Sequence, residues 1–448
     1  MTTSYLILVC LGGLLCLLWL LRRDQISLGL PIAYLYSLLL IHVPGALAHV
    51  FGRDFLLHSD LVDVAMRYTA LGVICFVLGC WWARSTAIHR VPMRTDVDRP
   101  RFWWFCFIGG LVLSFGLSNL YDIPSFNALG DKGSAIWMLG VLLGLRNAFQ
   151  RGDRKGIVIW ICALMVYPLV VLLFAGFLSY GSAAIIIICA ALTVSTRSSW
   201  RVMLGITVFT YVSLSIFVNY YENRTELRKE VWGGAPLDVR VNTVVDTFTN
   251  LQLFDPYNRQ HLVDLDDRLN QNYFVGLAAR RIERGQVAYL KGESLWEGLL
   301  ALVPRIFWPE KPVYGGSPQI VSKMTGLHFS SQTSIGVGNV MELQVNFGYP
   351  GIVVGFFVLG WAIGKLDFKA AIAERQGELG NAILFFLPCV AMIQPNGSIV
   401  EITGGSAAAL VAAYGWSLFW TRRIERHPAS ENGPSYSALA AHSNTRAV

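Results

Sequence analysis

The sequence predicts an all-α polytopic membrane protein, and two observations support that prediction. Of the 448 residues, 54% are hydrophobic and only 15% are charged, and the mean hydropathy is +0.49. The apolar residues also fall into blocks of roughly 18 to 22, long enough for a helix to cross about 30 Å of hydrocarbon. We therefore expect about eleven transmembrane helices and one large outward loop that contains amphipathic helices. The predicted spans are 4–21, 28–50, 64–83, 102–118, 134–149, 156–176, 181–196, 202–220, 346–366, 380–394 and 401–420.

The basic residues predict how the chain is oriented. With the amino terminus outside, the predicted inner loops and the carboxyl tail hold 20 of the 36 Lys and Arg residues and only 9 acidic residues. The only Lys and Arg residues in the short outer loops are Arg53 and Lys132, and Arg67 falls inside the third predicted span. Short loops rich in Lys and Arg stay on the cytoplasmic side of a membrane. The net charge of +7 and the pI near 9.0 therefore reflect topology and do not indicate nucleic-acid binding.

The predicted spans divide the chain into four parts. Residues 1–220 are expected to form a bundle of transmembrane helices, and residues 346–420 to add the last three spans. Residues 221–345 form an outward region with 13 basic and 14 acidic residues. Residues 421–448 are polar and are predicted to be a disordered cytoplasmic tail. All eight cysteines fall inside predicted spans, so neither a disulfide framework nor a thiolate metal site is expected.

Two stretches of the outward region have helical periodicity, namely Leu269 to Val287 and Leu295 to Ile306. Trp296 and Trp308 flank the second stretch, which is typical of a helix that lies in the membrane interface. A helix packed on the transmembrane bundle is the alternative. In both cases the chain that follows would be held close to the bilayer.

A rigid cationic segment, Pro304 to Pro312, follows the second helical stretch. Its fixed charges are Arg305 and Lys311, and Trp308 lies between them. Prolines restrict the backbone, and guanidinium groups match the geometry of phosphate, so the segment suits an anionic group at a bilayer surface. Other cations of the outward region could join it in a pyrophosphate clamp, or could simply be solvated: these are Arg224, Arg228, Arg280, Arg281 and Arg284.

Two residues are the leading candidates for a general base. Glu342 lies at the outer mouth of the ninth span, where partial burial would raise its pKa, and His328 titrates near neutral pH in its unperturbed form. Glu310 and Glu401 are weaker candidates on the same side. Asn346, one turn beyond Glu342, is a further candidate for contact with a substrate.

Metal and nucleotide chemistry have little support in the sequence. Asp264, Asp266 and Asp267 have the Asp-x-Asp spacing that some sugar-nucleotide transferases use for a divalent cation, but acidic residues are also common at helix starts. The chain has no phosphate-binding Gly-rich loop, no nucleophile elbow and no clustered metal-ligand histidines. A sugar donor would therefore be carried on a lipid and not on a nucleotide, and we expect no cofactor and no metal.

Four features of the chain belong together: the span pattern, the late outward loop, the segment Pro304 to Pro312, and Glu342 ahead of Asn346-Phe347-Gly348 and Gly351. In these features the chain resembles the oligosaccharide repeat-unit (Wzy-type, O-antigen) polymerases of bacterial inner membranes. The resemblance covers the architecture of the chain, but specific residues only from about 304 to 351. It implies metal-independent glycosyl transfer at the periplasmic face, between an undecaprenyl-pyrophosphate-linked donor and a lipid-linked acceptor. A chain-length regulator and a flippase are the partners that it suggests, beside membrane lipids.

The resemblance also implies roles for individual residues. Family members rely on periplasmic arginines, which map here onto Arg305 and, less directly, onto Arg280, Arg281 and Arg224. Arg305 and Lys311 would bind the pyrophosphate, with Glu342 or His328 as the base. Trp308 and Tyr314 would stack on sugar faces, although anchoring in the interface would explain them equally well.

Three other readings remain open. A different membrane glycosyltransferase, such as an O-antigen ligase, could hold a metal on Asp54, Asp60 or Asp63. A flippase or transporter is the main non-enzyme alternative, although few charges fall inside the spans, with Arg67 and Arg146 near helix ends. A structural scaffold would leave the long polar region unexplained.

Overall fold

The computed structural model describes residues 3–52, 54–85, 99–116, 132–175, 179–195, 199–249, 251–303, 308, 310, 316–329 and 335–421. Throughout these residues the chain is helical or irregular and contains no strand, so the predicted all-α class is confirmed at that level. The elements are α1 (Thr3–Asp24), α2 (Leu30–Leu40), α3 (Val43–Phe51), α4 (Ser59–Ser85), α5 (Arg99–Leu111), the π-helix η1 (Val112–Gly116), α7 (Gly133–Arg151), α8 (Arg154–Ala175), α9 (Ser179–Ser195), α10 (Ser199–Trp232), α11 (Leu237–Thr249), α12 (Arg259–Arg268), α13 (Asn272–Glu283), α14 (Glu293–Ala301), α15 (Ser317–Thr325), α16 (Asn339–Phe347), α17 (Tyr349–Gln376), α18 (Leu379–Ala391) and α19 (Ile399–Trp420).

Within the described residues, seven helical segments are long and apolar enough to cross a membrane. They are α1, the pair α2 and α3, α4, α8, α10, α17 and α19, and each coincides with a predicted span. Two more predicted spans coincide with shorter apolar helices, Ser182–Ser195 and Leu379–Ala391. The structure therefore has the architecture of a multi-pass helical membrane protein.

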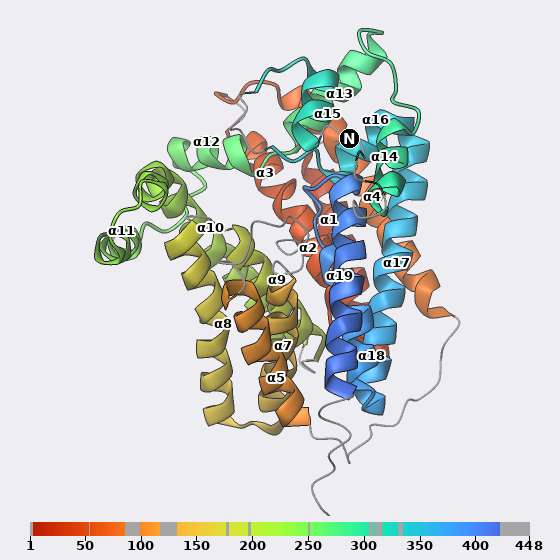
Figure 1. Cartoon of the computed structure of the whole chain (residues 1–448). Helices are drawn as coiled ribbons and strands as arrows, with labels where there is room; N and C mark the ends of the chain where they lie inside the picture. The colour runs from red at the N-terminus through yellow and green to blue at the C-terminus, as the bar shows by residue number, and fades with distance from the viewer. Residues whose placement is uncertain are drawn as a thin grey trace, which may run out of the picture.

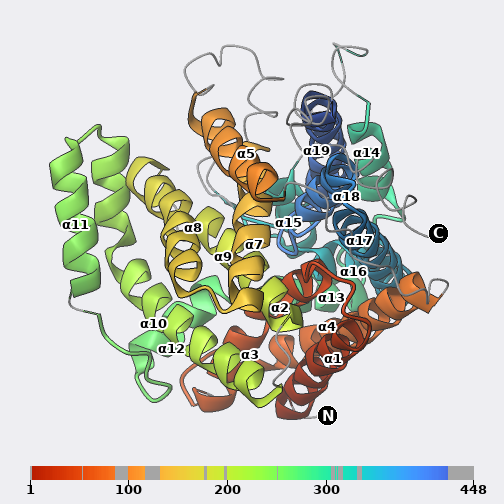
Figure 2. The same ribbon diagram turned by 90° about the horizontal axis from the view of Figure 1, so that it is seen from below.

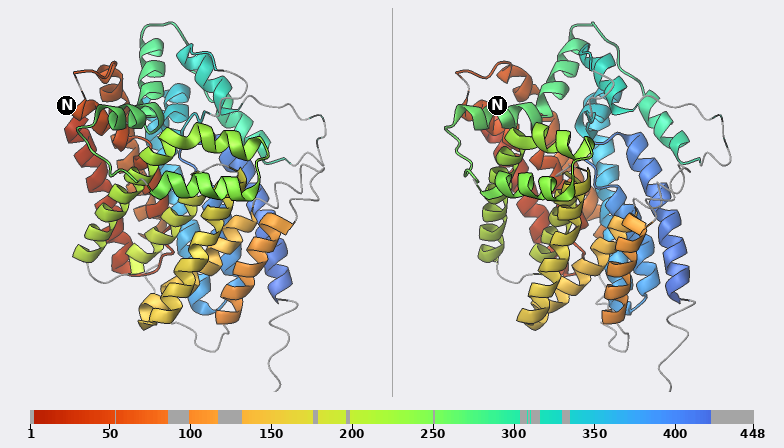
Figure 3. Two further views of the ribbon diagram at one scale, coloured as in Figure 1. Left: turned by 90° about the vertical axis from the view of Figure 1, so that its left-hand side faces the viewer. Right: turned by 60° about the vertical axis from the view of Figure 1, so that its left-hand side comes forward.

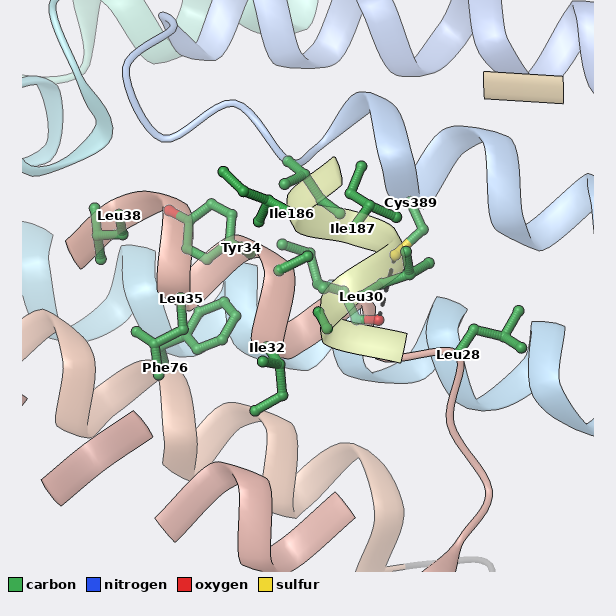
Figure 4. Close-up of a cluster of buried hydrophobic side chains, with 14 of the residues drawn as sticks. Leu28, Leu30, Ile32, Tyr34, Leu35, Leu38, Phe76, Ile186, Ile187 and Cys389 are labelled. Carbon is green, nitrogen blue, oxygen red and sulfur yellow. Dashed lines mark hydrogen bonds between the residues drawn. The ribbon is translucent and has the colours of Figure 1, made fainter. Parts of the chain in front are cut away.

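The bundle is organised around α2. Figure 1 shows the long helices running roughly side by side, and Figure 2, viewed along them, places α2 between α1, α4 and α17 on one side and α7 to α9 on the other. Leu30, Tyr34 and Leu35 of α2 are fully buried, and they lie among Phe76 of α4 and Ile187 of α9 (Figure 4). Because α2 is surrounded, it is apolar on all sides, as expected for a central helix.

Glycines bring α4 and α17 into close contact, and this is the most extensive helix pair of the described fold. A Cβ atom added to Gly79 would lie 2.2 Å from the carbonyl oxygen of Phe357, and one added to Gly360 would lie 2.2 Å from that of Phe76. Small residues allow helix backbones to approach each other in this way inside membranes. The pair forms the rigid centre onto which the polar helices pack.

The region predicted to lie outside is itself helical and rests on the bundle. Figure 1 shows α13 to α16 gathered at the end of the bundle where the chain begins, while α19 ends at the opposite side. α13 and α14 coincide with the two stretches of predicted helical periodicity. α13 packs against α4, where a Cβ added to Gly276 would lie 2.2 Å from the carbonyl oxygen of Leu61. The region is therefore continuous with the transmembrane core.

Two predicted boundaries differ from the structure. The predicted span 28–50 is two helices, α2 and α3, separated at Ile41 and His42, because Pro44 favours the start of a new helix. α10 continues to Trp232, past the predicted boundary at residue 220, and α11 then crosses the long axis of the bundle (Figure 3). A hydropathy pattern does not register the break, because both sides of it are apolar. The extension of α10 is polar, so hydropathy marks the end of the apolar span but not the end of the helix.

The loop between α18 and α19 interlocks with the start of α16. The Gly338 N–H donates to the Asn396 carbonyl at 3.1 Å, and the Asn339 N–H donates to the Pro395 carbonyl at 2.8 Å. The Asn339 side chain adds a bond to the Gly397 carbonyl at 3.0 Å and accepts one from the Tyr34 hydroxyl at 2.7 Å. These bonds join the outward region, α2 and the carboxyl-terminal helices into one unit.

Candidate functional site

The candidate site is built on α16, a short helix bounded by two glycines. Gly338 has φ of 72° and Gly348 has φ of 63°, which is the left-handed region that favours glycine. Between them, residues 339 to 346 are all buried. Four polar side chains are thus enclosed within a helix of nine residues, namely Asn339, Glu342, Gln344 and Asn346.

Glu342 is a fully buried carboxyl group. Its Oε2 accepts the backbone N–H of Ile399 at 2.7 Å, at the amino-terminal end of α19, while its Oε1 has no hydrogen-bond partner among the described residues. Burial raises the pKa of Glu342 to about 7; the Ile399 amide and the nearby Ser294 hydroxyl lower it, and Glu401 and Glu297 raise it. A carboxyl group that titrates near neutral pH can accept a proton from a substrate or return one.

Side chains of three other helices complete the site, two that influence Glu342 and a third, Ser317, that contacts Glu401. Ser294 comes from α14, Ser317 from α15 and Glu401 from α19. Ser317 Oγ donates to Glu401 Oε1 at 3.1 Å, and the other Glu401 oxygen accepts the Ser398 N–H at 3.2 Å in a capping box. We call Ser294, Ser317, Glu342 and Glu401 the Glu342 site. The Ser-x-x-Glu pattern at 398 to 401 could have located the start of α19 from sequence, but nothing local could have placed it beside Glu342.

Asn346 holds two elements of the site together. Its Nδ2 donates to Ser294 Oγ at 2.8 Å and to the Glu342 carbonyl at 2.7 Å, and its Oδ1 accepts the Gly292 N–H at 2.9 Å. The side chain is fully buried. Since both of its polar atoms are engaged within the protein, its placement favours a role in positioning Ser294 over the predicted contact with a substrate.

The predicted arginines contact different parts of the molecule. Arg280 forms an ion pair with Asp60 of α4, whereas Arg281 points to α15, where its Nη1 donates to the Met324 carbonyl at 3.5 Å. Arg224 lies on α10, with its guanidinium 3.9 Å from the ring centroid of Tyr221. A clamp made from these three residues is therefore not formed in this structure.

The other predicted site residues lie either outside the described residues or away from Glu342. Arg305, Lys311 and Tyr314 lie outside the described residues. Trp308 is 37% exposed, and His328 is exposed beside Phe329, whose ring meets that of Phe274. Within the described chain, no interaction connects His328 with the Glu342 site.

One residue of the acidic triplet, Asp266, connects α12 to α3. Asp264 accepts a bond from Gln260 at 2.9 Å, and Asp266 accepts bonds from His49 of α3 and from Asn270. Burial raises the pKa of Asp267, as do the charges of Asp266 and Asp264. Among the described residues, no group of three or more His, Cys, Asp or Glu side chains is arranged to hold a metal ion.

A separate polar cavity of about 290 Å³ lies between α10 and α11. Figure 1 shows α10 and α11 on the opposite side of the molecule from α14 and α16, which contribute to the Glu342 site. Sequence reasoning did not find the cavity, because its walls come from two helices joined by a turn at 233 to 236. It is lined by Asn219, Glu222, Asn223, Glu226, Thr243, Asp246 and Gln252.

Comparisons with known proteins identify the family of the chain. Residues 53–389 match a family described as a domain of unknown function, DUF8712. This match runs from the loop before α4 to the end of α18 and includes Glu342. No curated protein and no solved structure matches the chain. Because the match covers more than half of its length, the chain belongs to the DUF8712 family.

Proposed function

We propose that this protein polymerises lipid-linked oligosaccharide repeat units into a surface polysaccharide, by glycosyl transfer at the periplasmic face of a bacterial inner membrane. One observation carries the proposal. Glu342 is a buried carboxyl group whose pKa is raised to about 7, at the end of the bundle to which the polar helices pack. The donor and the acceptor are both undecaprenyl-pyrophosphate-linked oligosaccharides.

In the proposed reaction, Glu342 accepts the proton of the acceptor hydroxyl. The acceptor oxygen then bonds to the anomeric carbon of the donor, and the bond from that carbon to the pyrophosphate oxygen breaks. The pyrophosphate leaves as an anion, so it needs nearby positive charge. The proposal assigns this charge to Arg305 and Lys311, which lie in the chain between α14 and α15, the two helices that contribute Ser294 and Ser317.

The placement of α14 supports a substrate carried on a lipid. Gly298 faces α19, where its carbonyl accepts a bond from Thr403 Oγ1 at 2.7 Å. Away from this contact α14 exposes the large apolar side chains of Trp296 and Leu299, and Leu302 directly after the helix is exposed as well. A short helix with one packed face and one exposed apolar face suits the boundary between lipid headgroups and acyl chains. The pyrophosphate of a membrane-bound donor lies at that depth.

The proposal includes a topology of about eleven spans with a periplasmic amino terminus. It can be tested in a variant without the two exposed cysteines, Cys16 and Cys162. Gln286→Cys, on the proposed outer side, should react with an impermeant maleimide in intact spheroplasts. Lys155→Cys, on the proposed inner side, should react only after permeabilisation. The reverse pattern would contradict the orientation.

The functional test compares two variants of the proposed reaction residues with a variant of a control glutamate. Glu342→Gln and Arg305→Ala, in a strain that lacks the native gene, should abolish the long-chain polysaccharide ladder at normal protein level. Lipid-linked repeat units should then accumulate on the outer leaflet. Glu283→Gln, which alters an exposed carboxylate of α13, is the matched control and should give a normal ladder. A normal ladder from Glu342→Gln would remove Glu342 from the reaction.

A lipid-oligosaccharide flippase is the second candidate, because a broken helix favours it. The α2–α3 break places His42 in the interior, where its Nδ1 is 2.8 Å from Asn272 Oδ1. Interrupted helices with buried polar groups are typical of transport sites. The leaflet on which lipid-linked units accumulate in a deletion strain distinguishes the two functions. A strain without a flippase accumulates them on the inner leaflet, and a strain without a polymerase on the outer leaflet.

A third outcome would identify a ligase. In that case the polymer would form normally but would remain on its lipid carrier.

A further inference from the structure

Three side chains form a hydrogen-bonded chain at the junction of α3, α4 and α12. Ser59 Oγ, at the start of α4, is 3.0 Å from His49 Nδ1, and His49 Nε2 is 2.8 Å from Asp266 Oδ1. The His49 side chain is 4% exposed and that of Asp266 is 26% exposed. Ser59 is only 10 residues from His49, but Asp266 is 217 residues away, and no local motif joins the three.

The hydrogen bonds determine which atom donates. An ionised carboxylate only accepts hydrogen bonds, so His49 Nε2 carries the hydrogen that is shared with Asp266. The other ring nitrogen of the neutral imidazole, Nδ1, is then an acceptor, and the Ser59 hydroxyl must donate to it. Asn270 Nδ2 also donates to Asp266 Oδ1 and fixes the position of the carboxylate.

This arrangement has the connectivity of an activated nucleophile, with the serine on Nδ1 and the carboxylate on Nε2, the reverse of the usual assignment of the two ring nitrogens. A hydroxyl bonded to an imidazole, which is oriented in turn by a carboxylate, is recognised by its geometry and not by its order in the sequence. We propose that Ser59 is the nucleophile of an acyl-transfer site, with His49 as the base and Asp266 as a positioning residue, acting on an ester of a membrane lipid. This site is independent of Glu342 and of the proposed polymerase function.

The surroundings of Ser59 suggest the class of the substrate. Large exposed apolar side chains lie close to it in the chain, at Val50 and Phe51 at the end of α3 and at Leu57 in the following loop. On the polar side, Asp60 follows Ser59 directly and forms its ion pair with Arg280. Along the chain, Ser59 thus follows exposed apolar side chains that suit acyl chains and precedes a charged group that suits a headgroup.

The reaction balances without a further co-reactant. Ser59 Oγ attacks the ester carbonyl carbon and its proton passes to His49 Nδ1. The alkoxide of the lipid leaves with that proton, and an acyl group remains on Ser59. Water or an acceptor hydroxyl then attacks the acyl carbon, gives its proton to His49, and releases the acyl group with Ser59 restored.

The first experiment treats the purified full chain in detergent with a fluorophosphonate probe that carries a long alkyl chain. Ser59 Oγ should attack the phosphorus and displace fluoride, so the intact mass should increase by one adduct that peptide mass spectrometry assigns to Ser59. Ser322→Ala is the control, since Ser322 is a half-buried serine on α15, and it should be labelled like the parent protein. A folded parent protein with no adduct at Ser59 would overturn the proposal.

Two further comparisons test the mechanism and the substrate. His49→Gln and Asp266→Asn should each be labelled at least about 100-fold more slowly than the parent protein, because the base or its orientation is lost. Thermal unfolding would show that both variants are folded. Unchanged labelling in both would mean that the three residues only hold α12 on α3 and α4. A probe with a methyl group in place of the alkyl chain should react more slowly, and equal or faster reaction would overturn the assignment to a lipid ester.

Discussion

Arg84 Nη2 donates to Asp367 Oδ2 at 2.8 Å, and this ion pair is almost completely buried. The other carboxylate oxygen, Oδ1, accepts the backbone N–H groups of Leu28 and Leu30, at the start of α2. Arg84 also donates to the Ile26 carbonyl at 2.9 Å. The pair therefore fixes the connection between α1 and α2 to the ends of α4 and α17. Two turns further along α17, Glu374 pairs with Arg146 at 2.6 Å.

Asp367→Asn should destabilise the protein strongly. Asparagine keeps an acceptor for the two N–H groups of α2 but leaves the charge of Arg84 buried and unpaired, which costs about 3 to 5 kcal/mol. Thermal unfolding in detergent would measure the loss. The double variant Arg84→Met with Asp367→Asn should recover much of the stability, because no buried charge remains and the Leu28 and Leu30 N–H groups keep an acceptor. A single variant as stable as the parent protein would show that Arg84 finds another partner or reaches solvent.

Gly360→Ala should weaken the contact between α4 and α17. The new Cβ would lie 2.2 Å from the Phe76 carbonyl, so the two helices would have to separate. Gly415→Ala on α19 is the matched control, because nothing lies within 4 Å of its added Cβ. The control should be neutral or up to about 1 kcal/mol more stable, since alanine favours a helix over glycine. Equal unfolding temperatures for the two variants would contradict the close packing.

The stability of the protein should depend on pH through Glu342. Its carboxyl pKa is about 7 in the folded protein, against 4.5 for an ordinary glutamate. Because the folded state holds the proton more tightly than the unfolded state, stability should fall as pH rises from about 4.5 to about 7, and then level off. The loss should reach up to about 3 kcal/mol.

Glu342→Gln should remove this part of the pH profile and make the protein more stable than its parent at pH 8. Glu297 and Glu401, the other carboxyl groups that influence Glu342, are present in both proteins, so the difference between the two profiles isolates residue 342. Unfolding temperatures between pH 5 and pH 8 would provide the comparison. Parallel profiles would mean that Glu342 is ionised throughout this range.

Asn346→Ala should lower stability by about 1 to 3 kcal/mol, since it leaves the Gly292 N–H without its acceptor. It should also release Ser294 from its position near Glu342. Asn381→Ala is the control: Asn381 is exposed and bonds only to the nearby Glu378 at 2.8 Å within the described structure, so its loss should change stability by less than about 0.5 kcal/mol. Unchanged stability of Asn346→Ala would restore the prediction that Asn346 contacts a substrate.

Among the described residues, nine of the eleven predicted spans coincide with apolar helices, seven of them long enough to cross a membrane, whereas the connections were predicted poorly. Long apolar segments such as α1, α4 and α17 were found because their apolar content alone indicates them. Pro44 was a signal for the break between α2 and α3, but the apolar residues on both sides concealed it. The Arg84–Asp367 pair could not be predicted, because 283 residues separate its members and each is unremarkable alone.

At the candidate site too, local features could be predicted from the sequence and long-range contacts could not. The position of Glu342 at the mouth of a span favoured burial and a raised pKa, and the structure has both. Its partner at Ile399 is 57 residues away and contributes only a backbone amide, which no residue pattern encodes. The arginines were grouped by sequence and charge, whereas helix rotation directs Arg280 to α4 and Arg281 to α15.

The interlock between α16 and the loop that precedes α19 affects how the protein is made. Gly338 and Asn339 emerge from the ribosome well before Pro395 and Asn396, whose carbonyls they need, and Glu342 likewise precedes the Ile399 amide. Amino-terminal segments fold first during synthesis, so α16 must wait for α18 and α19 to complete its hydrogen bonds. The Glu342 site is thus assembled only when the last helices are in place, and a chain that ends before α19 would lack it even with every earlier span inserted.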